Sequence, residues 1–317
     1  MADASRKIAF QGVPGAYSHM ACQLVKPDMD TVACASFEDM LTQVQEGHAA
    51  LAMVPVENTT AGRVADIHHL LPQSGLHIIG EHFQRVNHHL LAPRGSRIEN
   101  LKTVHSHAQG LAQCRQQIRQ LGLTPIMHAD TAGAAKDVAA AGDASVAAVA
   151  SRLAAQIYDL EIIIDSLEDD KKNTTRFLIM AADSIVPEIG DVPMITTLVF
   201  QLRSVPAALY KALGGFATNG INLTKLESYL RPGVSERAQF YMDVEGHIDE
   251  PAMQLAMEEL RFYCMKDEVK VLGSYAASGE LSQIFPNSKF ILALRNPFDS
   301  VMSCFMQPFT PNDAMAN

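Results

Sequence analysis

Four consecutive side chains, Asn173-Thr174-Thr175-Arg176, have the residue types in this chain that best fit a chemical task. They follow the charged run 168–172 and lead into the apolar segment 177–181, which is typical of a β-strand. An amide, two hydroxyls and a guanidinium at the start of a rigid strand can meet a ligand at little ordering cost. They suggest hydrogen-bond donation to a small polar ligand. Taken alone, they also fit a solvated turn before a strand.

A second polar segment, beginning with Glu57-Asn58-Thr59, follows the apolar run 51–55. In an open α/β sheet, ligands bind beyond the carboxyl ends of the strands, which is where this segment falls. Glu57 is a candidate general acid if burial raises its pKa, and otherwise a carboxylate that anchors the loop. A polar loop without a ligand is the simpler alternative for this segment.

A glycine-containing turn, residues 11–18, connects the short strand 8–10 to a helix expected to run to about Lys26. A strand, a glycine turn and a helix start in this order form an anion-receptive pocket from backbone N–H groups. The turn lacks the third glycine of a dinucleotide fingerprint, and no acidic ribose partner follows at the expected distance. It therefore indicates a carboxylate or phosphate site, and no cofactor is expected.

The composition limits the classes of partner. The 317 residues are 48% hydrophobic and 19% charged, which is enough for about two domains with real cores. A net charge of −10 without clustered Lys and Arg argues against nucleic-acid binding. No apolar run approaches the ~20 residues of a membrane span, and the start of the chain lacks the apolar core of a signal peptide. A cytoplasmic protein that contacts no membrane is expected.

The cysteines and histidines do not form a metal-binding pattern. Five scattered cysteines without a C-x-x-C pair favour reduced, mostly buried thiols over disulfides or zinc ligation. Twelve histidines include the adjacent pairs His68-His69 and His88-His89. Adjacent side chains diverge on a strand or a helix, so neither pair makes a two-ligand face. A solvated or capping role is expected for them, and no metal site is predicted.

The elements that must position the polar segments alternate between strands and helices. Helix starts are predicted at the N-caps Ser36, Ser106, Asp130 and Ser151. Strands are predicted at 8–10, 32–35, 51–55, 102–105, 124–127, 145–148 and 161–165, with a long strand-like stretch at 76–92. Two βαβα lobes with crossings near 80–92 and 173–180 describe a hinged, two-lobed α/β fold of the periplasmic-binding-protein type. A ligand would sit in its cleft.

Four segments, 12–18, 54–59, 106–114 and 173–177, resemble the successive sequence blocks of prephenate dehydratase in the same order. The resemblance covers about residues 6–184. This family removes water and carbon dioxide from prephenate to give phenylpyruvate, a late step of phenylalanine synthesis. The resemblance implies that Thr175 is the catalytic residue. It also implies these substrate-binding residues: Tyr17, Glu57, Asn58, Thr59, Ser106, His107, Gln109, Asn173, Thr174 and Arg176. Thr59 stands where the family commonly has Ser, which keeps the hydroxyl.

The chemistry of prephenate assigns roles to these residues. Aromatisation drives the reaction once the ring hydroxyl can leave, and tight pairing of the ring carboxylate with an arginine would stabilise the ground state. Arg176 is therefore expected to orient the pyruvyl carboxylate or to brace the loop. Thr175 is expected to donate to the leaving oxygen and to relay a proton if one is supplied, while His107 positions the substrate rather than titrating.

A second domain is predicted after the Pro- and Gly-containing linker 187–193. Its elements over residues 194–276 follow the ferredoxin-like order βαββαβ, with Pro206 at the first position of a helix that ends at Asn219-Gly220. Segments 208–213 and 220–228 resemble an ACT domain, the amino-acid-binding module that usually follows prephenate dehydratase. The resemblance implies L-phenylalanine as effector and a homodimer or homotetramer, because ACT domains bind effectors between paired copies.

The resemblance places the effector at Ala208, Leu209, Asn222, Leu223, Glu227 and Ser228. Two departures stand out. The family's Gly-Ala-Leu block reads Ala207-Ala208-Leu209, which adds a methyl group where the backbone would approach the effector. Its Glu-Ser-Arg-Pro block is interrupted by two residues, Tyr229 and Leu230. Regulation by phenylalanine is expected, with an altered effector or a weakened affinity as the alternative.

Residues 277–317 lie beyond both predicted domains. Segment 289–303 resembles the strand-loop-helix of sulfotransferases that holds a nucleotide 3′-phosphate, but the partner phosphate loop of that family is missing from the sequence. A dispensable tail without function is expected.

Two other functions remain open at the level of sequence. An arogenate dehydratase would differ only in accepting an amino group where prephenate has a keto group. A non-catalytic regulator would combine a small-molecule cleft with an amino-acid sensor and would turn over neither substrate.

Overall fold

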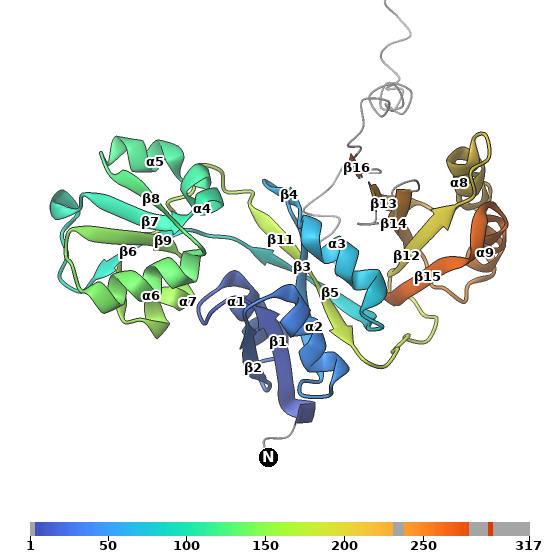
Figure 1. The fold of residues 1–317 in the computed structure, drawn as a ribbon, viewed down its shortest axis with the longest axis horizontal. Helices are drawn as coiled ribbons and strands as arrows, with labels where there is room; N and C mark the ends of the chain where they lie inside the picture. The colour runs from blue at the N-terminus through green and yellow to red at the C-terminus, as the bar shows by residue number, and fades with distance from the viewer. Residues whose placement is uncertain (1–3, 231–237, 279–290, 294–317) are drawn as a thin grey trace, which may run out of the picture. The chain divides into compact units, whose positions relative to one another are not determined.

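The computed structural model describes residues 4–230, 238–278 and 291–293 (Figure 1). The chain divides into two compact units, one within residues 1–186 and one within residues 187–277. Each unit has its own hydrophobic core.

The first lobe of the first unit is built on one mixed sheet. Its strands lie in the order β2-β1-β3-β11-β5, and the short β4 pairs with β3. Strand β1 is parallel to β2 and β3, whereas β11 is antiparallel to both β3 and β5. The elements are η1 (Ala4–Arg6), β1 (Lys7–Gln11), α1 (Tyr17–Val25), β2 (Asp30–Cys34), α2 (Phe37–Gln45), β3 (Leu51–Asn58), β4 (Gly62–Arg63), α3 (Ala65–Leu70), η2 (Leu71–Gln73), β5 (His77–Arg85) and β11 (Thr174–Ala181).

The second lobe has the strand order β10-β6-β9-β7-β8 and helices on both faces of the sheet, as Figure 1 shows. Leu111 and Ile118 pack on one face beside Val104, while the alanine-rich α6 and α7 pack on the other. The elements are β6 (His89–Pro93), η3 (Ile98–Asn100), β7 (Thr103–His107), α4 (Ala108–Gln113), α5 (Arg115–Gln120), β8 (Thr124–His128), α6 (Thr131–Ala141), β9 (Val146–Ala150), α7 (Arg152–Ile157) and β10 (Leu160–Ile164).

Two segments cross between the lobes, which confirms the two-lobed α/β fold. Residues 86–88 lead from β5 into β6, and residues 165–173 return from β10 to β11. The second crossing was predicted at 173–180, but those residues lie almost entirely in β11, inside the first sheet.

Three of the four predicted N-caps in this unit are confirmed. The side chains of Ser36, Asp130 and Ser151 each accept a backbone N–H of the first helical turn. The prediction for Ser106 is wrong by one residue. Strand β7 continues through His107, whose Nδ1 accepts from the backbone of Gln109 and caps α4.

The second unit has the predicted ferredoxin-like order of elements. Its antiparallel strands lie in the order β15-β12-β14-β13, and helices α8 and α9 share the core with residues of the sheet. The elements are β12 (Met194–Leu202), α8 (Ala208–Thr218), β13 (Leu223–Leu230), β14 (Ala238–Glu245), α9 (Pro251–Tyr263) and β15 (Cys264–Ala276).

The ends of α8 differ in how well the sequence predicts them. Gly220, with φ 71°, provides the left-handed residue after the helix, as expected. Pro206 is not the first helical residue. Ala207 is the N-cap instead, in a left-handed conformation with φ 58°, where a Cβ costs about 1–2 kcal/mol.

The predicted effector residues lie around α8 and β13. Ala208 begins α8, Leu209 packs against the core, and Leu223 is part of that core. Asn222 and Ser228 are half-buried, and the buried Glu227 pairs with Lys225 at 3.2 Å. Their binding role remains a prediction.

The sulfotransferase-like segment lies outside the described residues except for β16 (Ile291–Ala293), which pairs in parallel with β13. The interrupted Glu-Ser-Arg-Pro block, which ends at Pro232, also extends beyond the described residues. No helix in the described ranges is long and apolar enough to cross a membrane.

The thiols behave as expected, whereas the histidine pairs do not. The four cysteines in the described part of the chain, Cys22, Cys34, Cys114 and Cys264, are free and buried. Of the solvated or capping role predicted for the paired histidines, the solvated alternative is wrong for His68, His88 and His89, which are all buried. Where the described residues are concerned, no three His, Cys, Asp or Glu side chains are grouped to hold a metal ion.

Candidate active site

Two adjoining cavities in the first unit share Tyr17, Thr131 and Thr175 in their walls. The larger, about 540 Å³, falls in the size range of small-molecule sites. The smaller, about 110 Å³, contains most of the predicted polar groups. It is lined by Tyr17, Asn58, Val86, His88, His107, Gln109, Gly110, Gln113, Thr131, Asn173 and Thr175. The larger is lined by Gln11, Gly12, Val13, Ala16, Tyr17, Ser18, Cys34, Ala35, Pro55, Ala129, Asp130, Thr131, Thr175 and Phe177.

The two predicted polar segments meet because β3 and β11 are antiparallel neighbours. The end of β3 lies beside the start of β11, and Asn58 is the register partner of Thr175. Alternation along the strands then places Thr175 and Phe177 toward the cavity and the residue between them toward the other face.

The amide of Asn58 has a fixed orientation. Its Oδ1 accepts the backbone N–H groups of Thr60, at 3.0 Å, and Ala61, at 2.9 Å. Because a backbone N–H can only donate, the amide nitrogen must point the other way. There Nδ2 donates to Thr175 Oγ1 at 2.9 Å and to Asn173 Oδ1 at 2.7 Å. Thr175 therefore accepts within the protein and keeps its own proton for a ligand.

This order of donors and acceptors continues into the second lobe. Asn173 is 1% exposed, and its Nδ2 donates to Gln113 Oε1 at 2.8 Å. The Nε2 of Gln113 donates to Thr60 Oγ1 at 2.6 Å, and that hydroxyl donates to Asn58 Oδ1 at 2.7 Å. The four side chains Asn58, Thr60, Gln113 and Asn173 thus form a closed ring of hydrogen bonds that joins the two lobes.

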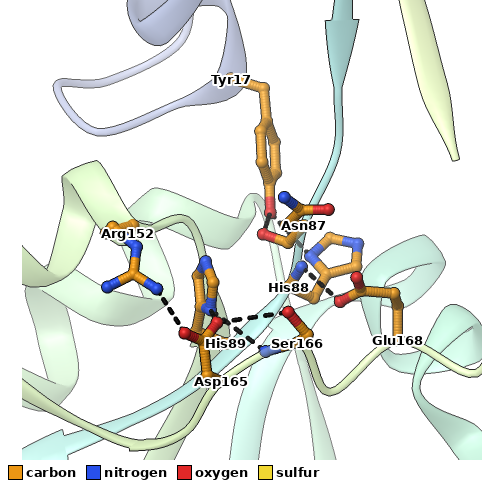
Figure 2. A network of polar contacts seen from close by, with 8 residues as sticks. All are labelled: Tyr17, Asn87, His88, His89, Arg152, Asp165, Ser166 and Glu168. Atoms are coloured by element: carbon orange, nitrogen blue, oxygen red, sulfur yellow. Dashed lines mark hydrogen bonds and ion pairs between the residues drawn. The ribbon is translucent and has the colours of Figure 1, made fainter. Parts of the chain in front are cut away.

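Tyr17 and His88 complete the wall of the smaller cavity. The Tyr17 hydroxyl lies 2.7 Å from the backbone oxygen of Asn87 and 2.9 Å from His88 Nδ1, as drawn in Figure 2. Burial raises the pKa of Tyr17 well above its usual value and lowers the pKa of His88. Both side chains are therefore neutral at pH 7.

Of the predicted substrate-binding residues, five line a cavity: Tyr17, Asn58, His107, Gln109 and Asn173. The predicted catalytic residue, Thr175, lines both cavities.

Ser106, Thr59 and Thr174 are not among the cavity-lining residues. The role of Thr174 stays a prediction, whereas the predicted contact of Ser106 and Thr59 with substrate needs correction, because their hydroxyls have partners within the protein. Ser106 is fully buried and donates to the backbone oxygen of Val149 at 2.6 Å. Thr59 Oγ1 donates to the backbone oxygen of Lys172 and accepts the N–H of Thr174, each at 2.9 Å. These hydroxyls hold strand ends together.

Arg176 is also wrongly predicted as a substrate ligand. It is 6% exposed, and its Nε and one terminal nitrogen both lie 2.8 Å from Glu81 Oε2 on β5. It therefore braces the sheet, whereas the alternative role considered for it was to brace the loop. Glu57 precedes Asn58 on an extended strand and so points to the other face, with Arg63 and Arg176 as its register partners. This orientation favours the anchoring role for Glu57 over the general acid.

Replacing Arg176 with Met is expected to lower the free energy of unfolding by about 3–5 kcal/mol, because Glu81 would lose its guanidinium partner in a buried site. The KM for substrate should change little. Urea titration of the single variant and of Arg176→Met with Glu81→Met measures this, and the double variant should recover part of the loss. A stable single variant with a greatly raised KM would restore the carboxylate-binding role.

The glycine turn contacts the second lobe. Ser151 Oγ donates to the backbone oxygen of Gly15 at 2.5 Å, and Tyr158 donates to that of Pro14 at 2.7 Å. A Cβ on Gly15, which has φ 92°, would lie 2.8 Å from the Cα of Ala154. Only glycine fits this close approach.

The sequence reasoning missed His88, Gln113, Thr131 and Thr60 as parts of the site. Gln113 lies within the block 106–114, and Thr60 follows Thr59 directly, so proximity to predicted residues was the available signal. His88 gave no such signal, because its partners are distant in sequence: Gln113 is 25 residues away and Tyr17 is 71.

Comparisons with known proteins show to which family the chain is similar. The family model described as prephenate dehydratase matches residues 8–185. A bifunctional N-acyl-homoserine lactone acylase/prephenate dehydratase from Komagataeibacter europaeus is 47% identical over 274 residues, covering 86% of this chain and 96% of that protein. Arogenate dehydratase 2 of Petunia hybrida is 37% identical over 87% of this chain and 73% of its own length.

A solved structure extends the similarity to three dimensions. The crystal structure of prephenate dehydratase in complex with L-Phe from Arthrobacter aurescens matches with a TM-score of 0.77 and 26% identity, over 94% of this chain and 98% of that one. The family match spans both lobes and every residue of the hydrogen-bonded ring. The chain therefore belongs to the prephenate dehydratase family.

Proposed function

We propose that the chain converts prephenate to phenylpyruvate, carbon dioxide and water, with Thr175 as the donor to the departing ring hydroxyl. The observation that carries this proposal is the fixed Asn58 amide, which makes Thr175 Oγ1 an acceptor within the protein and leaves its proton to the cavity. A neutral donor can stabilise charge that develops on the leaving oxygen.

In the proposed step, the bond between the ring and its hydroxyl oxygen breaks, together with the bond between the ring and its carboxylate. The electrons of the carbon–carboxylate bond complete the aromatic ring as carbon dioxide leaves. Hydroxide departs hydrogen-bonded to Thr175 and takes a proton from solvent to become water. The relay considered from sequence is not supported, because the Asn58 amide on Thr175 is not an acid that could replace its proton.

Helix α1 supports binding of one substrate carboxylate. Its N-cap, Ala16, offers no side-chain hydrogen bond to the first turn, and residues 16–18 line the larger cavity. Free N–H groups at a helix N-terminus favour an anion. No Arg or Lys side chain is among the described residues that line the two cavities, so the ring carboxylate is free to leave.

Incubation of the purified protein with prephenate, followed by detection of phenylpyruvate and carbon dioxide, tests the proposed function. Formation of both products in equal amounts supports it. If neither prephenate nor arogenate is turned over, the non-catalytic regulator is the function that remains. N-acyl-homoserine lactone is a useful third substrate because of the bifunctional relative. Hydrolysis at this site is not expected, because an amide rather than a base contacts the Thr175 hydroxyl.

Arogenate is the second candidate substrate, and Asp130 favours it. Among the described residues that line the two cavities, Asp130 is the only carboxylate. Its Oδ1 caps α6 by accepting the N–H of Gly133 at 2.6 Å. An anionic wall without Lys or Arg favours a substrate that carries an ammonium group, which arogenate has and prephenate lacks.

Replacing Asp130 with Asn is expected to lower kcat/KM for arogenate relative to prephenate by about tenfold, because one charge facing the ammonium is lost. Asn caps a helix as well as Asp, so the fold should be unaffected. Asp137→Asn is the matched control, since Asp137 lies on the same helix, pairs with His128 and does not line a cavity. An unchanged ratio of the two kcat/KM values would mean that Asp130 acts only as a helix cap.

We further propose that residues 6–184 form the catalytic domain and residues 194–276 an ACT-type domain that binds L-phenylalanine in a homodimer or homotetramer. The ferredoxin-like strand order and the phenylalanine complex of the Arthrobacter relative support this. Residues 277–317 are proposed to have no role in either activity.

Phenylalanine is expected to lower the initial rate in a saturable manner. The strained Ala207 at the start of α8 should weaken its binding, so Ala207→Gly should lower the half-inhibiting concentration. Initial rates across a phenylalanine titration, for wild type and variant, measure both effects. A flat response in both proteins would remove the regulatory proposal.

A further inference from the structure

His88 is bound on both ring nitrogens by groups of the cavity wall. Its Nε2 lies 2.7 Å from Gln113 Oε1, and its Nδ1 lies 2.9 Å from the Tyr17 hydroxyl. The ring is 2% exposed and meets Tyr17 edge-on, with ring centroids 5.5 Å apart. The two contacts reach α1 in the first lobe and α4 in the second, so this single side chain connects both walls of the cleft.

The hydrogen-bonded ring determines which nitrogen of His88 carries the proton. Gln113 Oε1 is an acceptor, because the fixed amide of Asn58 orients the Asn173 amide, and the Asn173 amide in turn orients that of Gln113. A hydrogen bond from His88 to that oxygen therefore requires N–H at Nε2. The neutral ring then presents a bare Nδ1.

The bare Nδ1 is one of two acceptors that together determine the direction of the Tyr17 hydroxyl. Tyr17 faces two acceptors on the crossing segment, Asn87 O at 2.7 Å and His88 Nδ1 at 2.9 Å. Its proton is shared between them, so the lone pairs of its oxygen are left for the cavity. The cavity wall thus offers a donor at Thr175 and an acceptor at Tyr17.

A neutral His88 is consistent with its surroundings. The carboxylate of Glu168 accepts the backbone N–H of His88 at 2.9 Å rather than a proton from a ring nitrogen. Its neighbour His89 has a different set of partners: Asp165 at 2.8 Å, which is itself bound by Arg152 (Figure 2). His89 contacts neither Tyr17 nor Gln113 through any of these bonds.

We propose that His88 is a positioning residue for the dehydratase reaction, which holds Tyr17 as a hydrogen-bond acceptor opposite the Thr175 donor. The ring hydroxyl of the substrate can both donate and accept a hydrogen bond, so Tyr17 and Thr175 together can hold it in one orientation. The proposal rests on the proposed function, which its kinetic test requires. A second test needs no turnover, because it measures the tautomer of His88.

The kinetic test compares His88→Leu with His89→Leu, since both histidines are buried and adjacent. We expect His88→Leu to lower kcat about 30-fold, as misplaced reacting groups do, and His89→Leu to lower it less than about 3-fold. In the Tyr17→Phe background, the His88→Leu loss should nearly vanish, because the two residues act as one unit. Equal losses in both leucine variants, or losses that multiply with Tyr17→Phe, would overturn the proposal.

The second test uses ¹⁵N NMR of the histidine rings in the full-length protein at neutral pH. The expected result is a neutral His88 protonated at Nε2, identified by the loss of its signals in His88→Leu. A ring protonated at Nδ1 or at both nitrogens would overturn the proposal even in an active enzyme. If the expected tautomer is found but no substrate is turned over, the proposed function fails and the geometry stands.

Discussion

Replacing Thr175 with Val is expected to lower kcat for the dehydratase reaction by about 10²–10⁴-fold, the range for a lost donor at the reacting group. Valine keeps the β-branched shape that suits strand β11, so the loss isolates the hydroxyl. Substrate affinity should fall much less, because one substrate carboxylate is proposed to bind at the N-terminus of α1 and not at Thr175. Stopped-flow detection of phenylpyruvate, with substrate binding measured separately by calorimetry, distinguishes the two effects.

The matched control is Thr175→Ser, which keeps the hydroxyl and its contact with Asn58. Its kcat should stay within about tenfold of wild type, since the donor is retained. A Val variant as active as the Ser variant would show that the hydroxyl takes no part in the reaction.

Replacing Asn58 with Asp is expected to lower kcat about 10²–10³-fold, because the donor network would be reversed. One carboxylate oxygen would still accept the N–H groups of Thr60 and Ala61. The other would replace Nδ2 and accept the Thr175 proton, which would no longer point to the substrate. Two oxygens would also meet at the Asn173 contact, now 2.7 Å, and stability should fall by about 1–3 kcal/mol.

The corresponding measurement combines kcat with chemical denaturation of the Asn58→Asp variant. The conservative change Glu57→Gln, at the adjacent residue on the opposite face of β3, serves as the control and should leave kcat nearly unchanged. An Asn58→Asp enzyme with wild-type kcat would mean that the orientation of this amide does not control Thr175.

Local signals in the sequence were enough to predict the elements and one part of the site. Ser36, Asp130 and Ser151 cap helices where expected, and of the predicted polar residues after the strand 51–55, Asn58 lines a cavity. The ferredoxin-like order of the second unit was also predictable from the alternation of its elements. The sequence did not predict the antiparallel pairing of β11 with β3 that brings Asn58 beside Thr175, because the βαβα alternation indicates a parallel sheet.

The errors arose where a distant partner decides the role of a side chain. In the sequence alone, Arg176 fits a ligand for a substrate carboxylate. In the fold, its partner is Glu81, which is 95 residues away and lies on the same buried face. Ser106 was predicted one residue too early as a cap, and the resemblance placed it in the cleft, whereas its hydroxyl donates to the backbone oxygen of Val149. Local periodicity contains no information on such contacts, so His88 and Gln113 could not be joined to Tyr17 from sequence.

The central claim concerns which substrate atom meets Thr175, and a crystal structure with a saturated-ring analogue of prephenate tests it most directly. Such an analogue keeps both carboxylates and the ring hydroxyl but cannot aromatise. The predicted result is a hydroxyl oxygen about 2.7–2.8 Å from Thr175 Oγ1, as a direct O–H···O bond requires. A carboxylate oxygen in that position, or a hydroxyl oxygen beyond about 4 Å from Thr175, would contradict the account.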